Sequence, residues 1–119
     1  MTKSKRAESR SKGKRGELAF VHFCKERGVA ARRTQQFCGT EGTSDVTLSG
    51  LPFAHIEIKR TERFQLYPAI EQAQRDSGSS GKLPFVFHKR NRGDWIMVCP
   101  GDVGLDLLRA WQDVAEGKE

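Results

Sequence analysis

The segment from Phe53 to Lys59 reads Phe-Ala-His-Ile-Glu-Ile-Lys, and after its first residue it alternates apolar and polar side chains without a break. Successive side chains of a β-strand point to opposite faces of a sheet, so the apolar residues can share one buried face. His55, Glu57 and Lys59 then share the other face. A buried charge is costly unless it is paired or binds a metal ion, so this second face needs either water or a partner.

A second acidic residue, Asp45, begins an earlier segment that has the composition of a strand, and residues 50–52, Gly-Leu-Pro, indicate a turn between the two segments. We therefore expect a hairpin that brings Asp45 close to Glu57. Two carboxylates can hold a hard divalent cation such as Mg²⁺, and Lys59 beside them can orient a water molecule or stabilise developing negative charge. The alternative is a half-exposed strand on which Glu57 and Lys59 lie separately in water.

Asp45 followed by Glu57-Ile58-Lys59 resembles the D…(D/E)-x-K signature of the PD-(D/E)XK nuclease superfamily, although Ser44 stands where a proline often precedes the aspartate. The resemblance implies an α/β, restriction-endonuclease-like core, with a central mixed sheet of about five strands flanked by helices. It also implies that Asp45 and Glu57 bind Mg²⁺, for which Mn²⁺ substitutes. Lys59 would position or activate the attacking water.

A helix is expected from Lys14 to Arg27, because Phe20, Val21 and Cys24 recur there at helical spacing. Glu17 lies on the same stripe, near the start of this helix. In the resembled family an early helix commonly donates a glutamate to the metal site, so the resemblance implies Glu17 as an additional metal ligand or as an acid behind the ligands. The alternative is an acid favoured in the first turn by the helix dipole.

A second helix is expected from about Pro68 to Asp76, because proline suits the first helical turn. Related nucleases often place a glutamine on the helix that follows the E-x-K strand. The resemblance therefore implies that Gln72 or Gln74 faces the site, and the sequence does not separate the two.

Three further strands are expected at residues 29–37, 83–89 and 94–99. Residues 39–44 form a glycine-rich loop that leads to Asp45, and its glycines allow the backbone to approach a phosphodiester. The alternative for this loop is a plain connection.

A final helix is expected after Pro100, and its outer face is acidic, so we do not place DNA on it. Its apolar residues recur at intervals of four and three residues: Val103, Leu107, Trp111 and Val114.

The charge of the chain is concentrated at its beginning. The 119 residues suit one domain and carry a net charge of +6, and residues 1–15 alone hold seven basic residues and one acidic residue. We expect a flexible basic arm at residues 1–13, too poor in apolar residues to fold alone, and a single nuclease-like domain at 14–119.

Three widely spaced cysteines argue against a zinc site. The chain has no membrane-spanning run or signal peptide, so a cytoplasmic location is expected.

A basic arm and a basic middle segment suit contact with phosphates. The residues expected to contact DNA are Lys14, Arg15, Arg32, Arg33, Ser44, Arg60 and Gln72.

These features predict a Mg²⁺-dependent endonuclease that hydrolyses DNA phosphodiester bonds in a structure-selective way. The order of candidate residues is similar to that of archaeal-type Holliday junction resolvases and small phage or prophage nucleases. This likeness implies branched DNA as substrate, a homodimer, and a bacterial or phage-infected cytoplasm. Two alternatives are a non-catalytic nucleic-acid-binding module and an assembly protein with a basic solubility tail.

Overall fold

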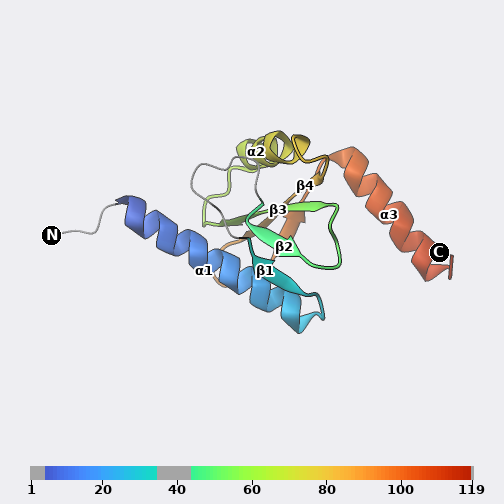
Figure 1. Cartoon of the computed structure of the whole chain (residues 1–119), viewed down its shortest axis with the longest axis horizontal. Coiled ribbons are helices and arrows are strands. Elements are labelled where there is room, and N and C mark those ends of the chain that lie inside the picture. Colours follow the sequence, from blue (N-terminus) through green and yellow to red (C-terminus); the bar gives the residue numbers. More distant parts are fainter. Residues whose placement is uncertain (1–4, 35–43, 119) are drawn as a thin grey trace.

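The computed structural model describes residues 5–34 and 44–118 and shows a five-stranded sheet with helices on both sides (Figure 1). The strands lie in the order β1-β2-β3-β4-β5; β3 and β4 are parallel, and the other neighbouring pairs are antiparallel. A parallel pair needs a crossover, which α2 provides, and the expected mixed α/β sheet is confirmed. The elements are α1 (Lys5–Glu26), β1 (Ala31–Arg33), β2 (Val46–Leu48), β3 (Ala54–Arg60), α2 (Leu66–Gly78), β4 (Leu83–Lys89), β5 (Ile96–Val98) and α3 (Gly101–Ala115).

The strands β2 and β3 form the expected hairpin. Val46 pairs with Ile56 in antiparallel register, and the Asp45 amide donates a hydrogen bond of 2.8 Å to the Ile56 carbonyl. One step further along this register, Asp45 lies beside Glu57. The hairpin therefore carries two acids that are distant in sequence to neighbouring positions of the sheet.

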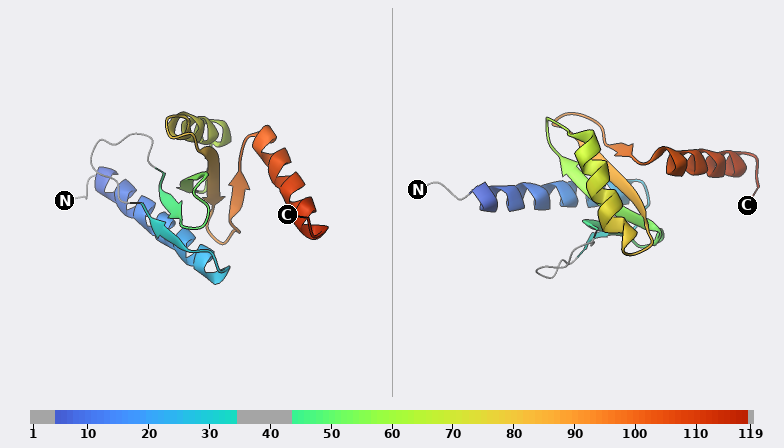
Figure 2. Two further views of the ribbon diagram at one scale, coloured as in Figure 1. Left: turned by 45° about the vertical axis from the view of Figure 1, so that its right-hand side comes forward. Right: turned by 90° about the horizontal axis from the view of Figure 1, so that it is seen from above.

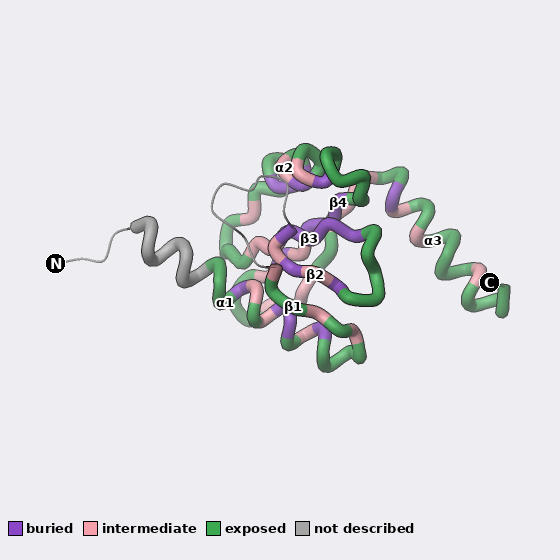
Figure 3. Tube along the Cα trace, in the orientation of Figure 1, coloured by how far each residue is buried: buried purple, intermediate pink, exposed green. Residues whose placement is uncertain are grey.

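The two faces of the sheet pack against different helices, as the two views in Figure 2 show. Ala54 and Ile56 of β3 join a core with Phe20 and Val21 of α1, and α2 packs its buried residues against Val86 of β4. Buried residues concentrate along β3 and on the helix faces that cover it (Figure 3). The polar face of β3 consequently lies under α2, where water has little access.

The helix α1 begins at Lys5, well before the expected start at Lys14, so residues 5–13 of the expected arm are helical. The early start has a physical reason: the segment is rich in lysine, arginine and other good helix formers and contains no proline, but it has no apolar stripe that periodicity can detect. Residues 1–4 lie outside the described residues. A separate role for this segment as a DNA-binding arm stays a prediction.

Other element boundaries differ by smaller amounts. The helix α2 is longer at both ends than the expected 68–76, and β1 covers only the middle of the expected strand at 29–37. The strand at 83–89 agrees with its expected bounds. Residues 35–37 and all but the last residue of the glycine-rich loop at 39–44 lie outside the described residues.

The helix α3 begins as expected but extends away from the rest of the domain (Figures 1 and 2). Val103 is buried and Leu107 packs against the core, whereas Trp111 is 75% exposed and Val114 is 71% exposed. With α1 extending on the other side, the molecule measures 60 × 32 × 25 Å. None of the described helices has the length and apolar character that a membrane crossing requires.

Candidate metal centre

Asp45 and Glu57 come together where the chain enters β2 and at the middle of β3. The Asp45 Oδ2 atom accepts a hydrogen bond of 2.8 Å from the Ile58 amide, which fixes its carboxyl group across the hairpin. Glu57 is 3% exposed. The hairpin expected from the sequence therefore places two largely buried acids side by side.

The position of the Asp45 carboxyl group raises its pKa from 3.8 to about 8. Burial is the largest cause. The charge of Glu57, a hydrogen bond between the two side chains and the more distant charge of Glu17 also raise this pKa, against a lowering effect of the Ile58 amide. Both desolvation and a neighbouring like charge disfavour the ionised form of a carboxylic acid. A cation placed between these groups would reverse that preference.

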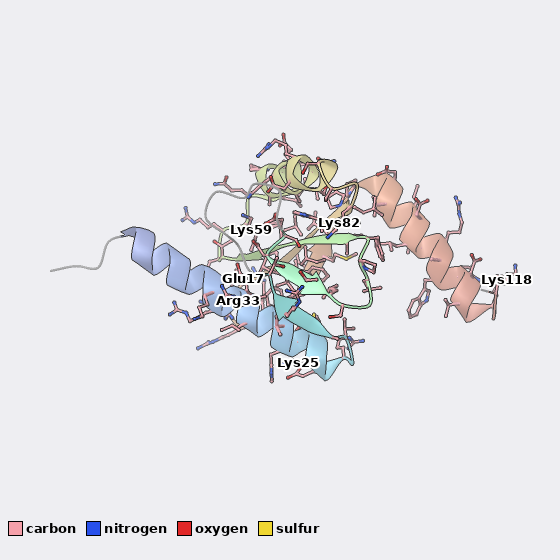
Figure 4. All side chains as sticks on the ribbon, viewed as in Figure 1. Glu17, Lys25, Arg33, Lys59, Lys82 and Lys118 are labelled. Carbon is pink, nitrogen blue, oxygen red and sulfur yellow. The ribbon has the colours of Figure 1, made fainter. Side chains whose placement is uncertain are left out.

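Glu17 reaches this region from α1, and its carboxylate accepts a hydrogen bond of 2.9 Å from Arg33 Nε of β1 (Figure 4). Sequence patterns did not predict this ion pair, because it depends on how α1 lies against β1 and not on any local pattern. It also occupies Arg33, one of the residues expected to contact DNA. The charge of Glu17 also raises the pKa of Asp45, by the smallest of the contributing effects.

Lys59 lies on the same face of β3 as Glu57, two positions further on. Its Nζ atom donates a hydrogen bond of 3.1 Å to Gln72 Oε1 of α2. Of the two glutamines left open by the sequence, Gln72 is the one that contacts the site residues, while Gln74 is exposed. The α2 helix thus holds the lysine in place above the polar face of the strand.

His55 and Asp76 also belong to this region, although sequence patterns predicted a site role for neither. His55 Nε2 and Glu57 Oε1 form a hydrogen bond of 2.8 Å, and both side chains are almost fully buried. The ligand atoms of His55, Glu57 and Asp76 all lie within 4.8 Å of one another. One signal was available: Gln72 and Asp76 are four residues apart and share a helix face, but the expected helix ended at Asp76.

The donor set fits a divalent cation. Asp45, Glu57 and Glu17 carry the carboxylate oxygens that Mg²⁺ prefers, but among the described residues the group of three whose ligand atoms all lie within 4.8 Å of one another is His55, Glu57 and Asp76. The His55, Glu57 and Asp76 group includes an imidazole nitrogen, which suits zinc better than magnesium. Glu57 belongs to both groups, so any ion held here would be expected to contact Glu57.

A cavity of about 790 Å³ lies between α1 and the chain that follows β3; Lys59 is among the residues that line it, whereas Asp45, Glu57 and Glu17 are not. Gly16 permits this close approach of α1 and β3, because a Cβ atom at Gly16 would lie 3.1 Å from Arg60 Cβ. Basic side chains outnumber acidic ones along its wall, which suits a phosphate group. The lining residues are Gly13, Arg15, Gly16, Ile58, Lys59, Arg60, Thr61, Glu62, Arg63 and Asn91.

The remaining residues expected to contact DNA differ in their exposure. Arg32 is exposed on β1 at the edge of the sheet, and Lys14 is exposed on α1 next to the cavity. Ser44, in contrast, is 7% exposed and its hydroxyl donates a hydrogen bond of 3.2 Å to the Val46 carbonyl. The Ser44 hydroxyl therefore has a structural partner two residues along the chain.

Comparison with known proteins identifies the fold but no family. A scan against models of known families finds no match, and a search of curated proteins finds no relative. A search of solved structures finds Hjc, a Holliday junction resolvase from the archaeal hyperthermophile Archaeoglobus fulgidus, with a TM-score of 0.56 and 19% identity over 72% of this chain and 75% of that chain. The chain therefore shares the fold of this structure, with a mixed five-stranded sheet between helices.

Proposed function

We propose that this protein is a metal-dependent endonuclease that hydrolyses phosphodiester bonds in DNA and prefers branched substrates. The convergence of Asp45 and Glu57 carries the proposal, because the neighbouring charge of Glu57 helps to raise the pKa of Asp45, and a shared cation would offset that repulsion. The basic cavity that Lys59 helps to line supports a phosphate-containing substrate. The likeness in fold to a Holliday junction resolvase supports a nuclease and a branched DNA substrate.

Asp45 and Glu57 would hold Mg²⁺ or Mn²⁺, with Glu17 as a further ligand or as an acid behind the ligands. When bound, the ion polarises a phosphate oxygen and lowers the pKa of a bound water molecule. Lys59, whose ammonium group donates a hydrogen bond to Gln72, would orient the attacking water and offset developing negative charge. The Ile58 amide and His55 keep the two carboxyl groups in fixed positions.

The DNA backbone would lie along the basic cavity, in contact with Lys14, Arg15 and Arg60. Arg32, Arg33, Ser44 and Gln72 stay in the proposed contact set, although Arg33, Ser44 and Gln72 each have a partner within the protein. A homodimer, a cytoplasmic setting and an origin in a phage or prophage are further parts of the proposal.

The proposal is tested with end-labelled four-way, flap and linear DNA, each incubated with Mg²⁺, Mn²⁺ or a chelator. We expect cleavage only with a metal ion, and fastest on the four-way junction. The variants Asp45→Asn and Glu57→Gln keep the shape and the hydrogen-bond acceptors of the native side chains. Each should slow cleavage by at least about a hundredfold while binding of uncut DNA persists.

The variant Glu71→Gln is the matched control, because it removes an equal charge from an exposed position on α2. Its cleavage rate should equal that of the native protein. If the protein binds DNA but forms no cleavage product with either metal ion, the result would contradict the proposal and favour the non-catalytic binding module. Unimpaired metal-dependent cleavage by both site variants would show that the reaction takes place elsewhere.

A further inference from the structure

The polar face of β3 carries a second set of possible metal ligands, on the side that α2 covers. His55 and Glu57 are 1% and 3% exposed, and Asp76 of α2 brings a carboxylate oxygen within 4.8 Å of a ligand atom of each. One turn before Asp76, Gln72 accepts a hydrogen bond from Lys59 of β3. One face of α2 therefore follows the polar residues of β3, so that a strand and a packed helix hold the three ligands.

The Asp76 carboxylate is left without a counter-charge in the described part of the chain. Its side chain forms no hydrogen bond or ion pair with any described residue, although it is half-buried. Glu57 Oε1 is bonded to His55 Nε2 at 2.8 Å. One imidazole, even when protonated, balances only one of the two carboxylates. A cation between the three groups would balance both.

The surroundings of this group increase the effect of any charge placed there. In the parallel pairing of β3 with β4, Glu57 lies opposite Val86. Val86 is fully buried and packs with Ala73, which lies on α2 between Gln72 and Asp76. An apolar wall of this kind makes an unbalanced charge costly and strengthens the attraction between a carboxylate and a cation.

We propose that His55, Glu57 and Asp76 form a zinc site, separate from the Mg²⁺ position proposed between Asp45 and Glu57. Zinc takes imidazole nitrogen and carboxylate oxygen at about 2.0–2.2 Å in tetrahedral geometry, which sets the ligand atoms about 3.3 Å apart. The distance of 2.8 Å between His55 Nε2 and Glu57 Oε1 and the limit of 4.8 Å for the group lie on either side of this value.

The composition of the group favours zinc over magnesium. Imidazole is a good ligand for zinc, whereas Mg²⁺ prefers oxygen ligands and keeps several of its own water molecules. Three protein ligands leave the fourth zinc position for a water molecule. The site uses no cysteine, so the spacing of the cysteines does not bear on it.

Because Glu57 belongs to both positions, occupancy of one affects the other. Zinc held on the α2 side of Glu57 would compete for its carboxylate with an ion held on the Asp45 side. Zinc should therefore slow cleavage supported by Mg²⁺, and this step alone rests on the proposed function. Zinc binding itself does not depend on it.

The test is calorimetric titration of the full chain with Zn²⁺ at neutral pH, without DNA or Mg²⁺. We expect the native protein to bind one zinc ion with micromolar or tighter affinity. Asp76→Asn keeps the shape of the side chain and has no described hydrogen bond to lose. It should weaken zinc binding by at least about tenfold, the smallest usual effect of removing a group that only supports a metal ligand.

Two control variants should bind zinc as the native protein does. Asp106→Asn makes the same replacement at an exposed position of α3. His22→Gln removes an exposed histidine of α1, whose ring contacts Glu26 and which offers zinc a surface position. If His22→Gln lost the zinc affinity and Asp76→Asn kept it, the proposal would be wrong.

Asp45→Asn separates the zinc site from the Mg²⁺ position. This variant should keep the native zinc affinity, and loss of affinity in Asp45→Asn but not in Asp76→Asn would place the ion between Asp45 and Glu57 instead. A native protein that binds no zinc in the micromolar range would also overturn the proposal. Since no DNA is present, a protein that binds zinc here but cuts no DNA would support this inference and contradict only the proposed nuclease.

Discussion

At the residue scale, Asp45 is the group whose chemistry the fold changes most. A carboxyl group with a pKa of about 8 keeps its proton at neutral pH when no cation is bound, in contrast to an ordinary aspartate. The proton relieves the repulsion from Glu57. The site is therefore prepared to exchange a proton for a metal ion, so metal affinity and pH are coupled at this residue.

A consequence for stability follows from the same shift. Between about pH 4 and pH 8 the folded protein binds one more proton at Asp45 than the unfolded chain does, so its stability falls as the pH rises through this interval. The slope from one proton is at most about 1.4 kcal/mol per pH unit. Urea unfolding with a chelator should show this decline for the native protein and a flatter profile for Asp45→Asn.

The Asp45→Asn variant keeps an acceptor for the Ile58 amide, so the comparison isolates the proton. Parallel pH profiles of the two proteins would show that Asp45 does not carry the effect.

At the element scale, the contact between α1 and β3 depends on Gly16. A methyl group there would lie 3.1 Å from Arg60 Cβ, which belongs to the strand itself and cannot swing away, whereas a methyl group at Gly13 meets nothing within 4 Å. Alanine in place of glycine stabilises a helix by roughly 0.5–1 kcal/mol when space allows. Crowding of a close contact costs about 1–3 kcal/mol.

We therefore expect Gly13→Ala to raise the free energy of unfolding by roughly 0.5–1 kcal/mol and Gly16→Ala to lower it by about 1 kcal/mol. Urea unfolding of the two variants measures both effects, and each variant is the control for the other. A stabilised Gly16→Ala protein would mean that α1 and β3 lie further apart than described.

Sequence patterns predicted the elements whose signal is local. The strand at 83–89, the hairpin that joins Asp45 to Glu57, and the start of α3 all follow from alternation, turn residues and spacing. The early start of α1 was missed, because helix propensity without an apolar stripe leaves no periodic signal.

For the candidate site too, the sequence predicted the contacts made within one hairpin but not those that depend on helix packing. The proximity of Asp45 and Glu57 follows from the hairpin, since it needs only one turn and one register. The Glu17–Arg33 ion pair and the position of Asp76 near His55 depend on how helices pack on the sheet. A pattern along one segment does not contain that information.

At the scale of the whole molecule, the charge of the first residues bears on DNA affinity. Replacement of Lys5, Arg6, Arg10 and Lys12 by glutamine keeps residues that favour helix but removes four positive charges. DNA binding should weaken and depend less steeply on salt, by up to about 0.9 in the logarithmic slope for each phosphate that the variant no longer neutralises. Fluorescence anisotropy at several salt concentrations measures both quantities.

The control variant replaces Lys25, Lys82 and Lys118, which lie on other parts of the molecule (Figure 4). It should leave the slope almost unchanged. Equal slopes for the first variant and the native protein would exclude the beginning of α1 from the DNA contact.

The length of α1 also sets how much DNA the protein spans. From Gly13 at the cavity to Lys5, the helix continues for eight residues, which is about 12 Å at 1.5 Å per residue. One turn of the double helix is about 34 Å, so the extension follows roughly a third of a turn. In the proposed nuclease it would lengthen the footprint along one arm of the substrate, and a shortened chain would still reach the scissile bond but protect fewer nucleotides.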